Sequence, residues 1–322
     1  RQADCPYPFK HLCGAAVAYK VICCLYEAYG IPKEETEEFL EFAGFATVGD
    51  VMDLIGENRI LVKEGLKRLN HTQNVGMASL IRACGLEEKE IKSYHIGFVL
   101  GPCINAGGRL DTAKRSLNLL LQKDRAKADV MAAELKALND ERKDMTQTGA
   151  EEAIEWIEKE GRSQDKVLVV YLPDCHESLA GIIAGRIRER YNKPVFVLTD
   201  SIDGVKGSGR SIEAYSMFKE MSKCKELYTK YGGHPMAAGL SLPKENVEKF
   251  RTFLNEHTTL TEEDFIPKIT IDVPMPIGYV TEHLIEELSV LEPFGKGNEK
   301  PLFAEKNLNI LSMRILGKNR NT

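Results

Sequence analysis

The sequence predicts a multidomain α/β protein, and a change of hydrophobic periodicity near Gly161 is the main reason. Before this residue, apolar positions recur at helical spacing, whereas β-rich runs alternate with helical segments after it. A long helical segment with a polar outer face lies between the two regions. At 322 residues, the chain is long enough for two or three domains, each with its own core.

The first ~115 residues are predicted to be mainly helical. The segment 11–29 has apolar residues at helical spacing and stops at Gly30-Ile31-Pro32, which ends the helix. Further helices are expected at about 33–44, 58–70, 75–84 and 87–95.

From Asp111 the pattern changes to long charged helices, with a short break near Lys123-Asp124. Beyond the break, apolar residues recur at spacings of four, three and seven up to Gly161. A helix this long usually connects two lobes. The alternative is a coiled-coil arm for dimerisation.

The region after Gly161 is predicted to be an α/β domain. The runs 166–172 and 194–199 flank a helix at 179–191, with Ser178 as its N-cap, and form a βαβ unit. Further strands are expected at about 204–211, 236–242 and 268–273, and helices at 213–222 and 244–256. The polar stretch 258–267 is typical of a linker, and 280–322 begins with a helix and ends in an apolar alternation up to Leu316.

Composition limits the class of protein. No apolar run approaches the ~18 residues of a membrane span, and the N-terminus has no signal pattern, so a soluble cytoplasmic protein is expected. The eight cysteines lack zinc-type spacing, which favours reduced and mostly buried thiols. The net charge of −5 is unusual for a nucleic-acid-binding protein, although a local positive stripe suffices for binding.

Three glycine-rich segments share one chemistry. They are Gly-Pro-Cys-Ile-Asn-Ala-Gly-Gly-Arg-Leu at 101–110, Gly-Ser-Gly-Arg-Ser at 207–211 and Gly-Gly-His-Pro-Met-Ala-Ala-Gly at 232–239. Each combines glycines, which let the backbone approach a ligand closely, with Arg109, Arg210 or His234. This combination suits phosphate, although each segment alone could be a turn that leads into a strand. Together they favour an extended anionic ligand, a polynucleotide rather than a mononucleotide.

The exact residues of these segments are more specific than their shared composition. "GPCINAGGRLDTA", "GSGRSIEAYSM", "YGGHPMAAGLSL" and "LEPFGKGNEKPLFA", in this order and spacing, resemble the RecJ family of single-strand-specific 5′-to-3′ DNA exonucleases, within the DHH phosphoesterase superfamily. The resemblance begins at "DCPYPFKHLCGAAVAYK" (4–20) and covers essentially the whole chain. It implies the C-terminal part of the DHH catalytic lobe at 1–115, a connector helix at 116–163, a DHH-associated α/β domain at 164–260, and a linker with the start of an OB-type DNA-binding domain at 261–322.

The resemblance also implies an activity. Such enzymes hydrolyse single-stranded DNA from 5′ to 3′ in DNA repair and recombination, with two Mn²⁺ or Mg²⁺ ions, and bind the strand in a cleft between lobes. The implied partners are single-stranded DNA, a single-strand-binding protein and a helicase, and the implied state is a monomer. The alternatives are a phosphodiesterase for very short RNAs or cyclic dinucleotides, and a catalytically dead DNA-binding scaffold protein.

The Asp-His-His triplet of the superfamily does not occur in these 322 residues. One candidate ligand cannot hold two metal ions. The chain is therefore expected to begin and end inside domains and to be inactive alone.

Site residues are assigned by the same resemblance. Asp50, in Gly44-Phe-Ala-Thr-Val-Gly-Asp50, matches the family motif whose aspartate binds metal and takes part in catalysis; a helix N-cap is the alternative. Asp53 is expected to be a solvated or capping residue.

Arg109, Arg210 and His234 are expected to be catalytic-site residues that hold the scissile or terminal phosphate; Arg109 could instead be a surface residue at a helix end. The further substrate-binding candidates are Asn105, Gly108, Ser208, Gly232 and Gly233. Cys103 stands where many relatives have a basic residue.

Two further motifs are given smaller roles. His176-Glu177 does not form a zinc-protease motif, because Ala180 stands where the second histidine is needed, so the pair is expected to shape the entry to the helix after Ser178. The turn Leu291–Asn298 is expected to lead into the OB-type domain, with Lys296 far from the chemical step.

Overall fold

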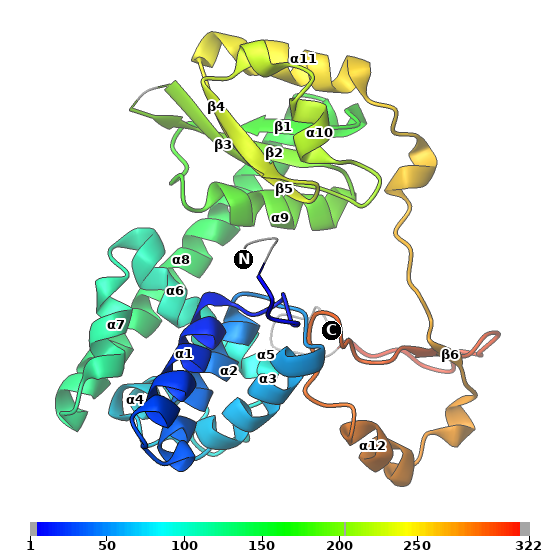
Figure 1. The fold of residues 1–322 in the computed structure, drawn as a ribbon. Coiled ribbons are helices and arrows are strands. Elements are labelled where there is room, and N and C mark those ends of the chain that lie inside the picture. Colours follow the sequence, from blue (N-terminus) through cyan, green and yellow to red (C-terminus); the bar gives the residue numbers. More distant parts are fainter. Residues whose placement is uncertain (1–4, 203, 316–322) are drawn as a thin grey trace. The chain divides into compact units, whose positions relative to one another are not determined.

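A computed structural model describes residues 5–202 and 204–315 (Figure 1). By internal contacts the chain forms two compact units. The first comprises Arg1–His71, Glu90–Gly97 and Ile269–Thr322, and the second comprises Thr72–Lys89 and Phe98–Lys268. These are packing units rather than evolutionary domains, so the four predicted domains remain predictions. Within the described ranges, no helix has both the length and the apolar character needed to cross a bilayer.

The first unit is built on three helices, α1 (Gly14–Ala28), α2 (Leu40–Gly49) and α3 (Gly56–Leu69). Glycines allow α2 and α3 to pack closely, because a Cβ on Gly44 would lie 2.9 Å from the Leu61 carbonyl oxygen. The predicted helices at 11–29 and 58–70 are confirmed. The predicted helix at 33–44 is instead a 3₁₀ segment, Lys33–Phe39, followed by α2.

The C-terminal part of this unit contains a 3₁₀ turn (Ile277–Tyr279), α12 (Glu282–Ser289) and a two-stranded ladder. In the ladder, β6 (Val273–Pro274) pairs in parallel with β7 (Phe303–Ala304). The predicted strand at 268–273 is therefore wrong for all but its last residue, and it does not join the main sheet. The apolar alternation has no regular structure up to Ile315, because a strand needs a neighbour for its backbone hydrogen bonds; Leu316 lies outside the described residues.

The predicted helix at 87–95 is wrong for all but its last three residues, because residues 87–89 form a turn and a bend and residues 90–92 have no regular structure. A helical run begins instead with α5 (Ser93–His95), continues as a π-helical turn (Ile96–Leu100) and becomes α6 (Gly101–Leu110). The first glycine-rich segment is thus a helix rather than a loop. Pro102 suits the first turn of a helix. Gly107 permits close packing, since a Cβ there would lie 3.0 Å from the Thr112 carbonyl oxygen.

The predicted long helix is confirmed as α8 (Arg125–Lys159), a helix of 35 residues, and its role as a connector between lobes stays a prediction. The predicted break is real, because Asp124 is the N-cap and its side chain accepts a hydrogen bond from the Lys127 amide. Helices α4 (Val75–Ala83), α6 and α7 (Lys114–Leu121) pack against α8 in the second unit. Leu135, Ala153 and Ile157 of α8 are buried by these contacts, whereas Met145 is exposed, so most of the apolar pattern is explained without a dimerisation arm.

The α/β region has a five-stranded sheet in the order β1-β2-β3-β5-β4 (Figure 1). The predicted βαβ unit is confirmed, since β1 (Leu168–Tyr171) and β2 (Val195–Ser201) are parallel and joined by α9 (Ala180–Tyr191). The other three strands are antiparallel: β3 (Gly204–Arg210), β4 (Lys230–His234) and β5 (Ala237–Leu242). Helix α9 packs on one face of the sheet, and α10 (Met217–Met221) and α11 (Val247–His257) pack on the other.

Three details differ from the predictions. Leu179, not Ser178, is the N-cap of α9. Strand β4 was not predicted, and His234 ends this strand instead of opening the next one. Part of the predicted linker at 258–267 packs onto the α/β region. Leu260 is buried in its core, and the Phe265 carbonyl accepts a hydrogen bond from Asn192. Leu260 and Phe265, two apolar residues in a polar stretch, hold this segment against the core.

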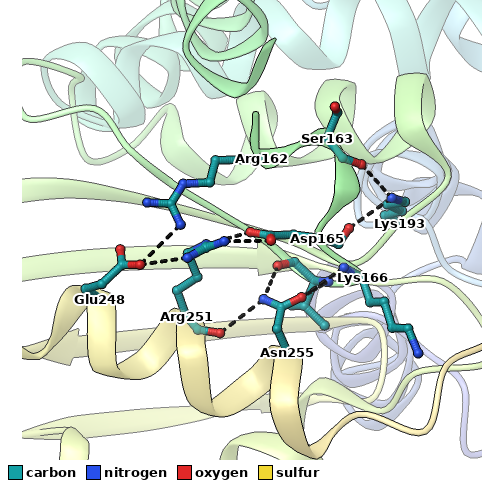
Figure 2. Close-up of polar contacts among 9 residues, drawn as sticks. Arg162, Ser163, Asp165, Lys166, Lys193, Glu248, Arg251 and Asn255 are labelled. Atoms are coloured by element: carbon teal, nitrogen blue, oxygen red, sulfur yellow. Dashed lines mark hydrogen bonds and ion pairs between the residues drawn. The ribbon is translucent and has the colours of Figure 1, made fainter. Parts of the chain in front are cut away.

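A polar network holds α11 to the start of the sheet (Figure 2). Arg251 forms two hydrogen bonds with the Asp165 carboxylate, at 2.5 and 2.6 Å, and a third with Glu248. The Asn255 amide bonds the backbone of Lys166 and Val167, as a neighbouring strand would. Side chains of α11 therefore satisfy the polar backbone at the start of β1.

We expect Arg251→Ala to lower the free energy of unfolding of the α/β region by about 2–3 kcal/mol, because Asp165 would keep a largely buried, unpaired charge. The two side chains are 18% and 13% exposed. Urea unfolding followed by fluorescence of Trp156, the single tryptophan, measures the loss. Lys249→Ala on the same helix is the control and should change stability by less than about 0.5 kcal/mol. Equal effects of both substitutions would contradict this role of the network.

Candidate functional site

Four arginines converge in the second unit from four different elements. They are Arg109 on α6, Arg142 on α8, Arg186 on α9 and Arg210 on β3. Their guanidinium groups donate to uncharged oxygens: the Ser178 carbonyl, the Asn139 side chain, the Gln147 side chain and the Gly209 carbonyl. Among the described residues, none of the four forms an ion pair with a carboxylate. We call this set the arginine cluster.

Several other arginines are paired with acids, as in Arg82–Asp129 and Arg162–Glu248. Within the cluster, the charges instead act against one another. Burial lowers the pKa of Arg142, and the positive charges of Arg109 and Arg186 lower it further. Burial and the charge of Arg109 likewise lower the pKa of Arg210. Such a concentration of like charge is relieved by an anion with several acceptor oxygens.

The first turn of α9 adds to this positive field. The Arg210 guanidinium lies against the turn, because a Cβ on Gly181 would be 2.8 Å from its Nη2 atom. The N-cap residue Leu179 provides no side-chain acceptor for the turn. The amide groups and dipole of a helix N-terminus attract anions, so helix and guanidinium favour the same kind of ligand.

Helix α6 presents the candidates of the first glycine-rich segment on one face. Asn105, Gly108 and Arg109 are all exposed and are spaced i, i+3 and i+4, which places them on the same side of a helix. Arg109 does lie in the last turn of its helix, as the alternative supposed. However, its Nη1 atom donates to the Ser178 carbonyl at 3.0 Å, which directs it towards the entry of α9.

The sheet aligns the remaining candidates in rows. Residues opposite one another on antiparallel strands point to the same face. One row is therefore Arg210, Ala237 and His234, and the next is Ser208, Gly239 and Gly232. A third row is Lys206, Ser241 and Lys230. Small residues occupy the centre of each row, so an extended ligand can lie close to the backbone between the cationic side chains.

A pocket of about 380 Å³ opens on this face. Ser208, Lys206, Lys230, Tyr231 and Gly239 belong to its lining, together with Ser178 at the entry of α9. The pocket and the arginine cluster are therefore neighbours, joined through Ser178.

The expected glycine-rich loops are not loops, which corrects their assumed role. The three segments lie in α6, in β3, and in the hairpin of β4 and β5. Gly209 is needed for packing, since a Cβ there would lie 2.6 Å from the Met217 sulfur. Gly233 has a φ of +154°, and a Cβ would lie 2.4 Å from the Ala237 carbonyl oxygen. Gly232 has no neighbouring atom within 4 Å of a Cβ, so of these three it alone is open to a ligand.

His176 and Glu177 shape the entry to α9. His176 Nδ1 lies 2.7 Å from the Ser178 hydroxyl, and Glu177 forms an ion pair of 2.7 Å with Lys206. The hydrogen bond and the charge of Lys206 lower the pKa of Glu177. The pair thus orders the segment that Arg109 contacts.

Asp50 lies in the first unit, at the C-terminal end of α2. Its amide donates to the Ala46 carbonyl at 2.8 Å, and its side chain is exposed. The N-cap alternative is therefore wrong, because Asp50 ends a helix and α3 begins only at Gly56. A carboxylate is unfavourable at the negative end of a helix dipole, so helix stability does not explain an aspartate here.

The turn Leu291–Asn298 packs onto the segment that follows Asp50, which corrects the expected distant position of Lys296. The Lys296 side chain forms an ion pair of 2.9 Å with Asp53, and its carbonyl accepts a hydrogen bond from the Leu54 amide at 2.6 Å. Arg59 Nη2 contacts the carbonyl oxygens of Val290, Leu291 and Glu292. Asp53 is therefore committed to Lys296 rather than solvated.

The described part of the chain does not fit a two-metal centre by itself. It contains no group of three or more histidine, cysteine, aspartate or glutamate side chains placed to hold an ion. Asp50 can supply one oxygen ligand, and no catalytic step follows from that alone.

Arg142 and Arg186 were missed by the sequence reasoning, because neither lies near a glycine-rich segment. A signal was present for Arg142. It stands on a face of α8 that is otherwise buried and small or uncharged, including Asn139, Thr146 and Gly149. A charged residue on such a face needs a partner, and no acidic residue stands three or four positions before or after Arg142.

Comparison with known families assigns two regions of the chain. A sequence model described as the DHHA1 domain matches residues 164–259, and one described as the RecJ OB domain matches residues 271–322.

Curated relatives align with nearly the whole chain. The chain is 37% identical to the single-stranded-DNA-specific exonuclease RecJ of Bacillus subtilis, over 99% of this chain and 40% of that protein. It is 33% identical to the enzyme of the same name from Escherichia coli, over 98% of this chain and 58% of that protein. The chain thus spans about half the length of these relatives.

Solved structures agree. The crystal structure of RecJ in complex with Mn²⁺ from Thermus thermophilus matches with a TM-score of 0.84 and 31% identity, over 93% of this chain and 44% of that one. Its counterpart in complex with Mg²⁺ matches with a TM-score of 0.82, over 92% of this chain and 46% of that one.

The arginine cluster predicts an unusual stability effect. Arg109→Gln should raise the thermal unfolding temperature at low ionic strength, because it removes a charge that acts on Arg142 and Arg210. The gain should disappear in 1 M salt, where the screening length is only about 3 Å. Arg188→Gln, which removes an arginine paired with Glu189, is the control and should not stabilise. A lower unfolding temperature for Arg109→Gln would show that the cluster is not under mutual repulsion.

Proposed function

Because this chain belongs to the RecJ family of single-stranded-DNA-specific exonucleases, we propose that it is the strand-binding part of an enzyme that hydrolyses single-stranded DNA from the 5′ end. The activity of the whole protein is a proposal, because the chain spans 40% and 58% of the two relatives named above. The match to the RecJ OB domain favours this function over a phosphodiesterase for short RNAs or cyclic dinucleotides.

The observation that carries the proposal is the unpaired charge of the arginine cluster. The cluster and the first turn of α9 form a site for phosphate oxygens, and Ser208 and His234 lie in adjoining rows of the sheet. In this proposal Arg109 and Arg210 hold one phosphate. Asn105, Gly108, Gly232 and the open pocket face accept the chain that continues from it.

The small residues between the rows explain a preference for an extended strand. Gly239, Gly232 and Ala237 allow a sugar-phosphate chain to approach the sheet backbone, and Lys206 and Lys230 add attraction that does not depend on base sequence. The residues of this chain bind and orient the substrate. Binding of this kind places the phosphodiester for attack without itself breaking it.

A divalent metal completes the proposed enzyme. Mn²⁺ or Mg²⁺ activates water and neutralises charge on the phosphorus oxygens when bound at such centres. In this chain Asp50 is the proposed ligand. The monomeric state, the cytoplasmic location and contacts with a single-strand-binding protein and a helicase remain predictions from the family resemblance.

The 322-residue chain should bind a 5′-phosphorylated single-stranded oligonucleotide, and Arg109→Ala or Arg210→Ala should weaken binding roughly 10–100-fold. Arg142→Ala and Arg186→Ala should also weaken binding. Each substitution should reduce the slope of log affinity against log salt concentration by about one. Fluorescence anisotropy at several salt concentrations measures both quantities. Arg188→Ala on α9 is the matched control and should bind as the parent chain does. If it weakened binding as much as Arg210→Ala, the cluster would not be the site.

In the full-length protein, Asp50→Asn should abolish release of mononucleotides while leaving oligonucleotide affinity unchanged, because the metal ligand is separate from the phosphate contacts. Without metal, the variant should be slightly more stable, by about 0.3–1 kcal/mol, because a negative charge leaves a helix C-terminus.

Asp53→Asn is the control, since Asp53 is committed to Lys296, and it should retain turnover. We expect the 322-residue chain alone to release no mononucleotides with Mn²⁺ or Mg²⁺. Full turnover in Asp50→Asn would show that Asp50 is not an essential metal ligand. Robust turnover by the 322-residue chain alone would refute the proposal that further residues of a larger protein are needed for the metal centre.

A further inference from the structure

Two cysteines in the second unit face each other, and one of them lies on α6, the helix that carries Arg109. Cys84 is the C-cap of α4, and Cys103 lies in the first turn of α6. Their sulfur atoms are 3.7 Å apart. No sequence pattern pairs them, because they are 19 residues apart and two helical segments lie between them.

The two thiols differ in exposure and in charge state. Cys103 is fully buried, whereas Cys84 is partly exposed. A hydrogen bond from the Cys103 thiol lowers the pKa of Cys84, and the charges of Lys136 and Lys143 on α8 lower it further. A partly exposed thiol with a lowered pKa is the reactive kind, and a second thiol in contact can resolve its oxidised form.

We propose that Cys84 and Cys103 are a redox site, which a hydroperoxide converts into an intramolecular disulfide between α4 and α6. The Cys84 thiolate attacks one peroxide oxygen, which forms a sulfenic acid and releases hydroxide. The Cys103 sulfur then attacks the Cys84 sulfur, the S–S bond forms, the S–O bond breaks and water leaves with the Cys103 proton. Two thiols lose two electrons in total, and hydrogen peroxide becomes two water molecules.

The second step is helped by the first. The pKa of Cys103 is raised chiefly by the hydrogen bond that it donates to Cys84, and then by burial. Once Cys84 is oxidised, it no longer carries the charge that holds this proton. The charges of Lys136 and Lys143 then lower the pKa of Cys103 against the effect of burial, which helps its proton to leave as the sulfur attacks.

The disulfide would act on the proposed binding site. The sulfur atoms must approach by about 1.7 Å to reach bonding distance. Helix α6 cannot absorb this shift freely, because Gly107 is packed against Thr112 and Leu135. Arg109 is six residues beyond Cys103, about 9 Å along the same helix. Oxidation should therefore displace Arg109 from its contact with Ser178, an effect that rests on the proposed phosphate site.

The modification itself is tested without DNA. The 322-residue chain is treated with hydrogen peroxide, and non-reducing peptide mapping by mass spectrometry should find Cys84 and Cys103 joined, with a loss of about 2 Da that dithiothreitol reverses. Cys175 is the matched control, because it is also partly exposed but burial raises its pKa, so it should react more slowly. If both Cys84 and Cys103 stayed reduced while Cys175 or the exposed Cys5 and Cys24 were oxidised, the proposal would be overturned.

The coupling to binding is tested separately. Oxidation should weaken affinity for a 5′-phosphorylated oligonucleotide severalfold, and dithiothreitol should restore it. Cys103→Ser should bind normally and lose the response to peroxide. A disulfide that leaves affinity unchanged would overturn the coupling but not the redox site. Failure of the reduced chain to bind DNA at all would instead count against the proposed function.

Discussion

The close packing of three elements against α8 is the constraint on which the site depends. Helix α8 contacts α4, α6 and α9, and small residues make these contacts possible. A Cβ on Gly149 would lie 2.7 Å from the Ile183 side chain of α9, and a Cβ on Gly107 would lie 3.4 Å from Leu135. Larger residues would separate the helices. The arginine cluster exists because α6, α8 and α9 meet at this distance.

The cluster is electrostatically unfavourable for the isolated chain. Burial and mutual repulsion lower the pKa values of Arg142 and Arg210, and their partners are uncharged oxygens. Several other arginines form ion pairs with acids, as Arg251 does with Asp165 through two hydrogen bonds. The arginines of the cluster thus differ from Arg251, whose charge is balanced by an acid. This contrast supports the proposal that the cluster binds an anion.

Local patterns predicted the elements whose apolar period is long and regular, such as α1, α8 and the βαβ unit. They failed where tertiary contacts decide the conformation. The glycines of 101–110 suggested a loop, but Gly107 is a packing residue within a helix, and the helix starts with Pro102 in its first turn. Strand β4 contains two glycines, which have little strand propensity, and it exists because β5 offers its edge. Arg142, Arg186 and Lys296 could not be placed, since their partners are distant in sequence.

Asp50 and Arg210 illustrate one physical principle in two separate units. Asp50 places a negative charge at the C-terminal end of α2, and Arg210 places a positive charge against the first turn of α9. Both are the less favourable sign for that end of a helix. A ligand of opposite charge reverses the sign of each interaction, because a cation is attracted by both the carboxylate and the last carbonyls of α2, and an anion by both the guanidinium and the first amides of α9. The signs of these two charges therefore support the proposals that Asp50 binds a cation and that Arg210 binds a phosphate.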